Sequence, residues 1–352
     1  MFPAYYVLGA NKYLERFGLS FEDFAVGQRF RHRPGITLSQ QDNVDEALDT
    51  QNAAMVHYDQ HYSAQTAWKV PIMVSTATVQ RLIGMASKTF GKRRRIFGFS
   101  EISLTSPIFG GDTIYCDSEI IAAKPGDEDC GVLTVATSGF KAEGVDVMKP
   151  FAKLTYDVEV FKRDRHPEER ARREPLAPAQ GARFAAHRDE AGLFVEQAGF
   201  FFEDAAVGET FVHYPRRTFG RDEAMEHAWR SLDLSPQFHD ALWIDAHQGG
   251  RYRIPETFVL GAVTALTTRT FGRVVANLGW TNIQLSNVYA GDTLTVESTI
   301  IERRESKSRP NEGILTVDTR ASNQHASEVC SYRRNLLVYR RDAETPYARA
   351  GY

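Results

Sequence analysis

The chain has 352 residues, of which 42% are apolar and 25% charged, so a wholly disordered or collagen-like chain is excluded and two or three folded units are expected. Its 42 basic and 45 acidic residues give a net charge of −3, which leaves no overall basic field for nucleic acid or an anionic membrane. Its apolar runs are shorter than the ~20 residues of a membrane-spanning helix, so we expect a cytoplasmic protein without membrane contact. The three cysteines lack the spacing of a disulfide framework or a zinc site, and we interpret Cys116, Cys130 and Cys330 as small buried apolar residues.

An internal repeat divides the chain. Residues 21–27, FEDFAVG, recur as FEDAAVG at 202–208, and Thr89-Phe-Gly91 recurs as Thr270-Phe-Gly272, in both cases 181 positions later. Because units of this length can each bury a core, the repeat indicates a duplicated domain and not a solenoid. We therefore predict a first domain at 1–164, a linker rich in Arg, Ala and Pro at 165–192, and a second domain at 193–352.

Each copy shows one helical pattern followed by four strand patterns. Between Val70 and Phe90 apolar residues recur near every 3.6 positions with small residues between them, which predicts a buried helix; its counterpart is 258–271. Alternating apolar residues then predict strands at 96–108, 113–122, 131–140 and 151–161. This order predicts an α+β unit in which a curved antiparallel sheet wraps around a central helix, and we expect the two units to join their sheets back to back.

The residues before the first helix resemble a known signature. Segment 52–64, NAAMVHYDQHYSA, precedes 70–75, VPIMVS, and together they resemble the active-site motif of the MaoC-like dehydratases, the (R)-specific enoyl-CoA hydratases of hotdog fold. The opening Phe-Glu-Asp-x-x-Val-Gly, Asp42 and the late Gly-Asp-Thr extend the resemblance over nearly the whole chain. It implies a tandem (double) hotdog, each unit built on a long central helix.

The resemblance also implies an activity. Members of the family are hydro-lyases that reversibly add water to a 2-enoyl-CoA thioester, with no cofactor apart from the coenzyme A that the substrate carries. Because the family includes mesaconyl-CoA hydratases of similar two-copy build, a short, branched or dicarboxylic acyl group is expected. The resemblance further implies a small-molecule acyl-CoA substrate. Because most soluble oligomers are symmetric dimers, we also expect two such chains to form a homodimer.

Residue by residue, the first copy matches the motif in part. His57 takes the place of the catalytic histidine, Asn52 that of the catalytic aspartate and Asp59 that of a later aspartate. Ser75 stands where the family has a glycine whose backbone N–H helps to bind the thioester oxygen. Hydration needs a base for water, an acid for the α-carbon and donors for the enolate-like oxygen. His57 would be the titrating group, while Asn52 could orient water without accepting its proton.

The second copy departs from the motif differently. Counted back from Ala246, His239 falls in register with His57, Asp233 could be the acid, and Ala241 replaces the later aspartate. Gly261 matches the family's glycine. For Asp59 we prefer a helix cap or ion-pair partner to a role in catalysis.

A basic run follows the first helix. Lys92 and Arg93, with the next two arginines, could contact the phosphates of coenzyme A, although a solvated turn is the simpler interpretation. Two other functions remain open on the same fold. One is an acyl-CoA thioesterase, in which an Asn/His pair orients water at the carbonyl, and the other is a non-catalytic module that binds acyl thioesters.

Overall fold

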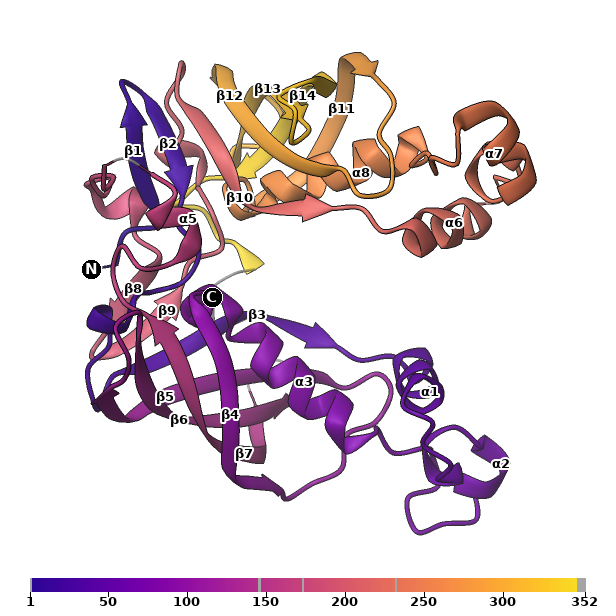
Figure 1. Ribbon diagram of the computed structural model, residues 1–352. Coiled ribbons are helices and arrows are strands. Elements are labelled where there is room, and N and C mark those ends of the chain that lie inside the picture. Colours follow the sequence, from indigo (N-terminus) through magenta and orange to yellow (C-terminus); the bar gives the residue numbers. More distant parts are fainter. Residues whose placement is uncertain (1, 145–146, 173, 232, 347–352) are drawn as a thin grey trace.

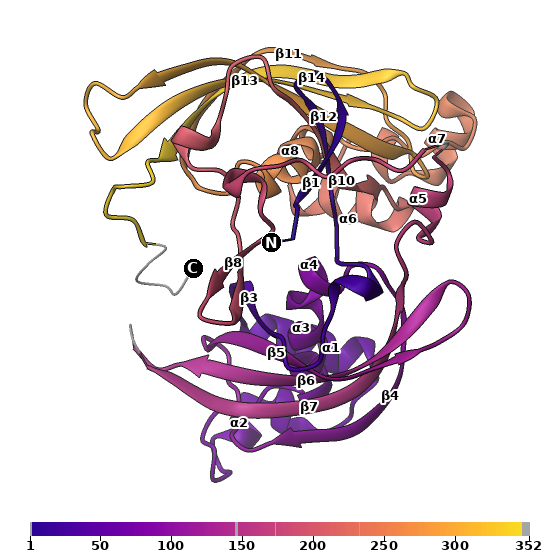
Figure 2. The ribbon, with the colours of Figure 1, turned by 90° about the vertical axis from the view of Figure 1, so that its left-hand side faces the viewer.

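The computed structural model describes residues 2–144, 147–172, 174–231 and 233–346. The chain forms two lobes of the same design, each a seven-stranded sheet curved around a central helix (Figure 1). In a perpendicular view the sheets lie on the outside and the central helices α3 and α8 lie between them (Figure 2). The predicted α+β class and double hotdog fold are confirmed.

The first half of the chain supplies the first set of elements, most of which build the first lobe. They are β1 (Tyr5–Gly9), β2 (Lys12–Glu15), β3 (Arg29–Thr37), α1 (Gln40–Asp49), the 3-10 turn η2 (Met55–His57), α2 (Gln60–Ser63), α3 (Ser75–Met85), α4 (Ser87–Phe90), β4 (Arg93–Leu104), β5 (Thr113–Pro125), β6 (Cys130–Ala142) and β7 (Met148–Phe161).

After α5 (Pro167–Arg170), the second half repeats this order. Its elements are β8 (His187–Glu190), β9 (Leu193–Glu196), β10 (Thr210–Thr218), α6 (Arg221–Arg230), the 3-10 turn η5 (Pro236–Phe238), α7 (Ala241–Gln248), α8 (Glu256–Leu266), β11 (Val274–Leu285), β12 (Thr293–Glu305), β13 (Glu312–Ser322) and β14 (Glu328–Tyr339).

The two halves of the chain exchange hairpins, and the expected sheet design is corrected. The strand orders are β1-β2-β10-β12-β13-β14-β11 and β4-β7-β6-β5-β3-β9-β8, so the N-terminal hairpin joins the second sheet and the β8–β9 hairpin joins the first. The pairs β2–β10 and β3–β9 are parallel, so neither sheet is purely antiparallel. The two sheets also do not join each other. Strand β8 begins inside the segment expected to be a linker.

The central helix begins later than the pattern suggested. Apolar periodicity placed its start at Val70, but α3 begins at Ser75. Pro71 disfavours helical geometry in the residue before it, and Ile72 instead pairs with Phe109 in a short bridge. The Met73 N–H donates to the Ile108 carbonyl at 2.8 Å. Residues 70–74, just before α3, are therefore extended and pair with the chain that follows β4; we call this segment the strap.

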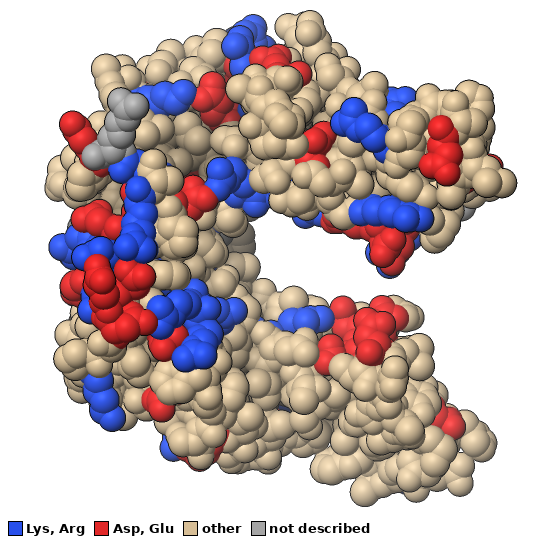
Figure 3. All heavy atoms as spheres, in the orientation of Figure 1, with Lys and Arg blue, Asp and Glu red and all other residues tan. Residues whose placement is uncertain are grey.

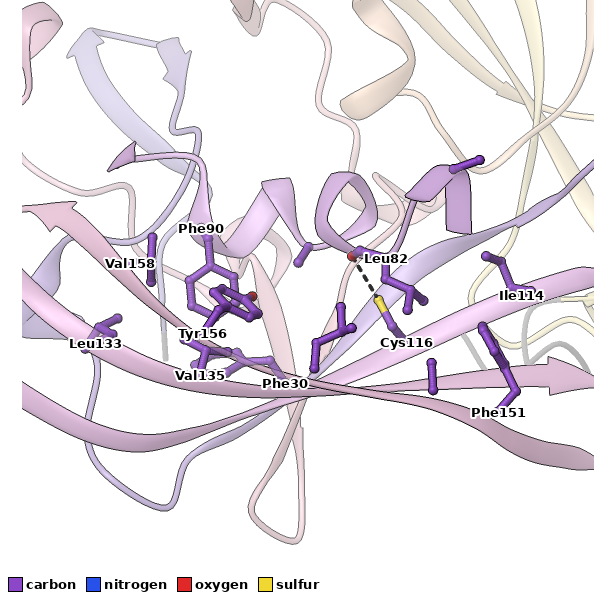
Figure 4. Close-up of a cluster of buried hydrophobic side chains, with 14 of the residues drawn as sticks. Phe30, Leu82, Phe90, Ile114, Cys116, Leu133, Val135, Phe151, Tyr156 and Val158 are labelled. Atoms are coloured by element: carbon purple, nitrogen blue, oxygen red, sulfur yellow. Dashed lines mark hydrogen bonds between the residues drawn. The ribbon is translucent and has the colours of Figure 1, made fainter. Parts of the chain in front are cut away.

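The core of the first lobe lies between α3 and the inner face of its sheet. Leu82 of α3 contacts a layer that includes Phe30, Ile114 and Phe151, all at most 1% exposed (Figure 4). The Cys116 thiol donates to the Leu82 carbonyl at 3.5 Å, and burial raises the pKa of this thiol well above its usual value. All three cysteines are free and buried, as predicted.

Each exchanged hairpin carries a glutamate into a buried polar cluster of the opposite lobe. Glu196 of β9 accepts from the ring Nδ1 of His32 at 3.0 Å and from the Thr89 hydroxyl at 2.7 Å. In the other lobe Glu15 of β2 does the same with His213 at 2.9 Å and Thr270 at 2.6 Å. Thr89 and Thr270 of the repeated Thr-Phe-Gly segment therefore have the same role, since each binds the hairpin that comes from the other half of the chain.

One buried histidine makes the first of these clusters sensitive to acid. The His187 Nε2–H donates to the Thr89 hydroxyl at 3.0 Å, while Thr89 donates onward to Glu196. Burial is the main reason that the pKa of His187 falls to about 4. Burial alone would raise the pKa of Glu196, but the charge of His32 and its hydrogen bond lower it to about 2.

Acidification should therefore weaken the fold in a defined window. Between the ordinary histidine pKa of ~6.5 and about 4, the unfolded chain binds a proton that native His187 does not, so the free energy of unfolding should fall by roughly 3 kcal/mol as the pH drops. Urea unfolding at pH 7, 5.5 and 4 measures this. His187→Gln should flatten this slope, whereas His61→Gln, at an exposed site, should not; an unchanged slope in His187→Gln would contradict the assignment.

Candidate functional site

His57 ends η2 and its ring is held in one tautomer. Its Nδ1 lies 2.9 Å from the carbonyl oxygen of Ile72, which can only accept, so Nδ1 carries the proton and donates. Nε2 is then left with its lone pair, the form that a general base requires. The ring is partly exposed, so water can reach it.

Asn43 of α1 fixes the backbone around this histidine, and the sequence interpretation missed it. Its buried amide Nδ2 donates to the His57 carbonyl at 2.7 Å and to the Ile72 carbonyl at 2.9 Å. Its Oδ1 accepts from the Val74 N–H at 2.7 Å. One side chain therefore joins the histidine turn, the strap and the start of α3. The signal available in sequence was weak, because an amide inside a helix is ordinarily solvated.

Ser75 is the first residue of α3, so its position at the helix entrance is as predicted. The first N–H groups of an α-helix have no intrahelical partner, and they carry the positive end of the helix dipole. Ser75 lines a pocket of about 250 Å³ whose lining combines polar residues, such as Thr78 and Thr105, with apolar ones, which include Trp68, Ile72, Met73, Leu104 and Phe151. Ile72 links the two features, since its carbonyl holds His57 and the residue itself forms part of the pocket wall.

Asn52 and Asp59 make local contacts on either side of the histidine. The Asn52 side chain accepts from the Ala54 N–H at 3.0 Å and so shapes the turn into η2. Asp59 is the N-cap of α2 and accepts from the Tyr62 N–H at 2.8 Å. Asp59 thus has the capping role that we preferred, and Asn52 stands five residues before His57 without bonding to it.

The second lobe corrects the expected register by one residue. Turns η2 and η5 are equivalent, and Asp233 shapes its turn as Asn52 does, accepting from the Ser235 N–H at 3.0 Å. With this spacing Phe238 occupies the place of His57, and His239 that of Tyr58. Asp240 caps α7 as Asp59 caps α2, so the later aspartate is present and Ala241 does not replace it. Counting back from Ala246 was misleading because α7 is longer than α2.

His239 is nevertheless an unusual side chain. Its Nε2 is buried and has no hydrogen-bond partner among the described residues. Its ring lies 6.1 Å from that of Trp229. The histidine therefore lies in the loop expected to hold a site, although one position away from that of His57.

Gly261 is not at a helix entrance, which corrects a second expectation. It is the sixth residue of α8, where its N–H is used within the helix and is not available to a substrate oxygen. The residue equivalent to Ser75 is Glu256, which begins α8 and pairs with Arg253. A carboxylate at this position would repel a developing oxyanion.

The basic run after α4 is divided between the interior and the surface. Lys92 is 4% exposed, is ion-paired with Glu169 and donates to the Ser20 hydroxyl at 3.1 Å. Burial and the neighbouring Arg16 lower the pKa of Lys92. Lys92 therefore cannot contact a phosphate without breaking this ion pair, contrary to expectation. Arg93 is exposed at the start of β4.

Comparison with known proteins relates part of the chain to one family. A family model described as mesaconyl-CoA hydratase matches residues 180–349. This match covers just under half of the chain, so it is the second half that resembles this family of MaoC-like dehydratases. A mesaconyl-CoA hydratase of Cereibacter sphaeroides is 35% identical over 156 residues, which are 42% of this chain and 44% of the relative. A β-methylmalyl-CoA dehydratase of Chloroflexus aurantiacus is 29% identical over 141 residues, 39% and 40% of the two chains.

The matched segments thus span less than half of these curated relatives of the family. Among solved structures, a MaoC domain protein dehydratase from Chloroflexus aurantiacus covers 92% of this chain and 98% of its own, at 16% identity and a TM-score of 0.40. A double-hotdog protein from Mycobacterium tuberculosis covers 92% and 99%, at 17% identity and a TM-score of 0.36.

A second cavity lies outside the His57 site. This cavity, of about 470 Å³, is lined by residues of both lobes and of the exchanged hairpins, among them Glu15, His187 and Glu196. Among the described residues no group of three or more His, Cys, Asp or Glu is arranged to hold a metal ion. The described helices include none long and apolar enough to cross a bilayer.

Proposed function

We propose that this protein is a hydro-lyase that reversibly adds water to a 2-enoyl-CoA thioester, and that its first lobe performs the reaction. The observation that carries this proposal is the hydrogen bond from His57 Nδ1 to the carbonyl of Ile72, because it leaves Nε2 as the acceptor and because Ile72 itself lines the pocket at the N-terminus of α3. The equivalent place in the second lobe is occupied by Phe238, which cannot transfer a proton. The relatives named hydratases and dehydratases support the reaction class.

The chemistry needs only groups present in the first lobe. His57 Nε2 takes a proton from water while the water oxygen bonds to the β-carbon of the substrate. Electron density moves to the thioester oxygen, which the N–H groups at Ser75 stabilise. The imidazolium then returns the proton to the α-carbon, so one water is consumed and His57 is regenerated. Asn52, at the turn before His57, would orient the water.

The pocket supports a short acyl group. Its volume of about 250 Å³ and the apolar part of its lining, which includes Trp68, Met73 and Phe151, suit a few carbon atoms and not a long chain. Mesaconyl-CoA, a branched dicarboxylic thioester, is the finer substrate that we propose, because relatives with this name match the chain. Arg93 is the one member of the basic run that we retain as a contact for the coenzyme A phosphates.

The test is loss of the enoyl-thioester absorbance on mixing purified protein with crotonyl-CoA or mesaconyl-CoA, with free thiol assayed in parallel. Loss of the band without thiol release is the expected result. Thiol release from a saturated acyl-CoA would show a thioesterase instead. Saturable binding of both thioesters with neither reaction would support an acyl-thioester binding module and overturn the proposal.

A further inference from the structure

The cavity of about 470 Å³ is a separate feature from the pocket at Ser75, because the two share no lining residue. Its volume lies within the range of roughly 300 to 1,000 Å³ that small-molecule sites occupy. Basic side chains from both halves of the chain stand on its wall. They are Arg16, Lys88, Arg183, Arg269 and Arg341.

Small side chains leave this space open at places where the first copy of the repeat has large ones. Ala198 lines the cavity and stands 181 positions after Phe17, whose ring lies 4.5 Å from the guanidinium of Arg269. Ala186, also in the lining, stands 181 positions after the buried Tyr5. Because protein interiors are close-packed, a space of this size between two lobes needs an occupant, either water or a ligand.

Two of these cations have no carboxylate at hydrogen-bond distance among the described residues, whereas the other three are each ion-paired. Lys88 of α4 donates from Nζ to the carbonyl of Arg33 at 2.8 Å, and the described part of the chain offers it no ion pair. The Nε of Arg269 lies 3.7 Å from the carboxylate of Glu15, and its Nη1 is buried without a described hydrogen-bond partner. Lys88 and Arg269 stand 181 positions apart, so each copy of the repeat supplies one of them.

The two hairpin glutamates on the wall balance this pair only in part. Glu15 and Glu196 each already accept hydrogen bonds from a histidine and a threonine. Burial is the main cause of the lowered pKa of Lys88; the charge of Glu196 opposes this effect, and that of Arg269 adds to it. The two cations are therefore close enough to repel each other. On the outer surface of the junction between the lobes, by contrast, basic and acidic side chains lie side by side (Figure 3).

We propose that this cavity binds a phosphate group, free or carried by a small organic molecule, between Lys88 and Arg269. Near neutral pH a phosphate carries about two negative charges and several acceptor oxygens, so one group can meet a cation from each copy of the repeat. A carboxylate has a single charge and fits this pair less well. Burying a cation without a counter-ion is costly, and the bound phosphate would offset that cost. The site does not depend on the hydration reaction.

The experiment is isothermal titration calorimetry of the full chain with inorganic phosphate, at an ionic strength held constant with chloride. Wild type should bind one phosphate per chain. Lys88→Gln and Arg269→Gln should each weaken binding by about tenfold or more, because each removes a charged donor. Acetate should bind more weakly than phosphate.

Two matched variants make the assignment specific. Lys88→Arg keeps the charge and introduces the residue type found at the equivalent position of the second copy, so it should bind phosphate nearly as well as wild type. Arg230→Gln removes an exposed arginine outside the cavity lining and should leave the affinity unchanged. Titration with glycerol 3-phosphate distinguishes the two sources. Tighter binding than that of inorganic phosphate would show that an organic group uses the rest of the cavity, and equal or weaker binding would favour free phosphate.

Thermal unfolding of the wild type provides a measurement that does not depend on how the variants fold. Because the cavity is built by both lobes of the folded chain, millimolar phosphate should raise Tm more than chloride does at the same ionic strength. The proposal would be overturned by a wild type that binds no phosphate at millimolar concentration or binds acetate as tightly. It would also be overturned by an affinity that survives both glutamine variants, or by a Tm that responds equally to phosphate and chloride.

Discussion

Replacing His57 with alanine should lower kcat/KM for hydration of the enoyl-CoA by about 100- to 10,000-fold, which is the range ordinarily lost when a general base is removed. The loss should lie in kcat, because alanine removes the proton acceptor at Nε2 and leaves the pocket beside Ser75 in place. The measurement is the rate of loss of the enoyl-thioester band, with circular dichroism confirming that the variant is folded.

His239→Ala is the matched control, because it removes the histidine of the equivalent loop in the other lobe. The one-residue difference in register places His239 with Tyr58, so this variant should keep most of the activity. If His239→Ala abolished hydration and His57→Ala did not, the reaction would belong to the second lobe. That outcome is worth testing because the Nε2 of His239 is buried and has no hydrogen-bond partner among the described residues.

The repeated fold could be predicted because its signals are local. Alternation along 113–122 and 131–140 and the 3.6-residue period around Leu82 are set by which face of a strand or helix is buried, and β5, β6 and α3 follow them. The exchange of hairpins could not be predicted in this way. β2 and β9 have the same local pattern whichever sheet they join, and the partners of Glu15 and Glu196 lie far away in sequence.

The parts of the candidate site that could be predicted are those that depend on where a residue stands in a turn or at the start of a helix. His57 and Ser75 stand where a motif requires them, at a turn and at a helix start. His239 was placed by counting residues back from Ala246, and the count failed because α7 is longer than α2. Gly261 was matched to the family's glycine by its residue type, but α8 already begins at Glu256. Asn43 had no motif at all, because its role consists of three contacts with backbone groups brought together by folding.

Asn43→Ala should lower both stability and turnover. The Ile72 and His57 carbonyls keep other donors, His57 Nδ1 and Gln40 Nε2, but the buried Val74 N–H loses its acceptor. An unsatisfied buried N–H costs roughly 1 to 3 kcal/mol, so we expect a decrease of about 2 kcal/mol in the free energy of unfolding. With the strap and the histidine turn no longer joined, kcat should fall by at least about tenfold while KM changes less.

The second lobe suggests a variant that separates the effect of Asn43→Ala on stability from its effect on turnover. Ala224 occupies the place of Asn43, and Pro255, which has no N–H to satisfy, occupies the place of Val74. Val74 has φ −56°, which a proline adopts without strain, and Pro255 has φ −52°. The double variant Asn43→Ala/Val74→Pro should therefore recover much of the stability in urea unfolding.

That double variant should not recover kcat, because the amide that joined the histidine turn to the start of α3 is still missing. Stability regained without turnover would identify Asn43 as a positioning residue for His57. Turnover regained together with stability would show that Asn43 serves the fold alone, and that the active arrangement of His57 and Ser75 forms without it.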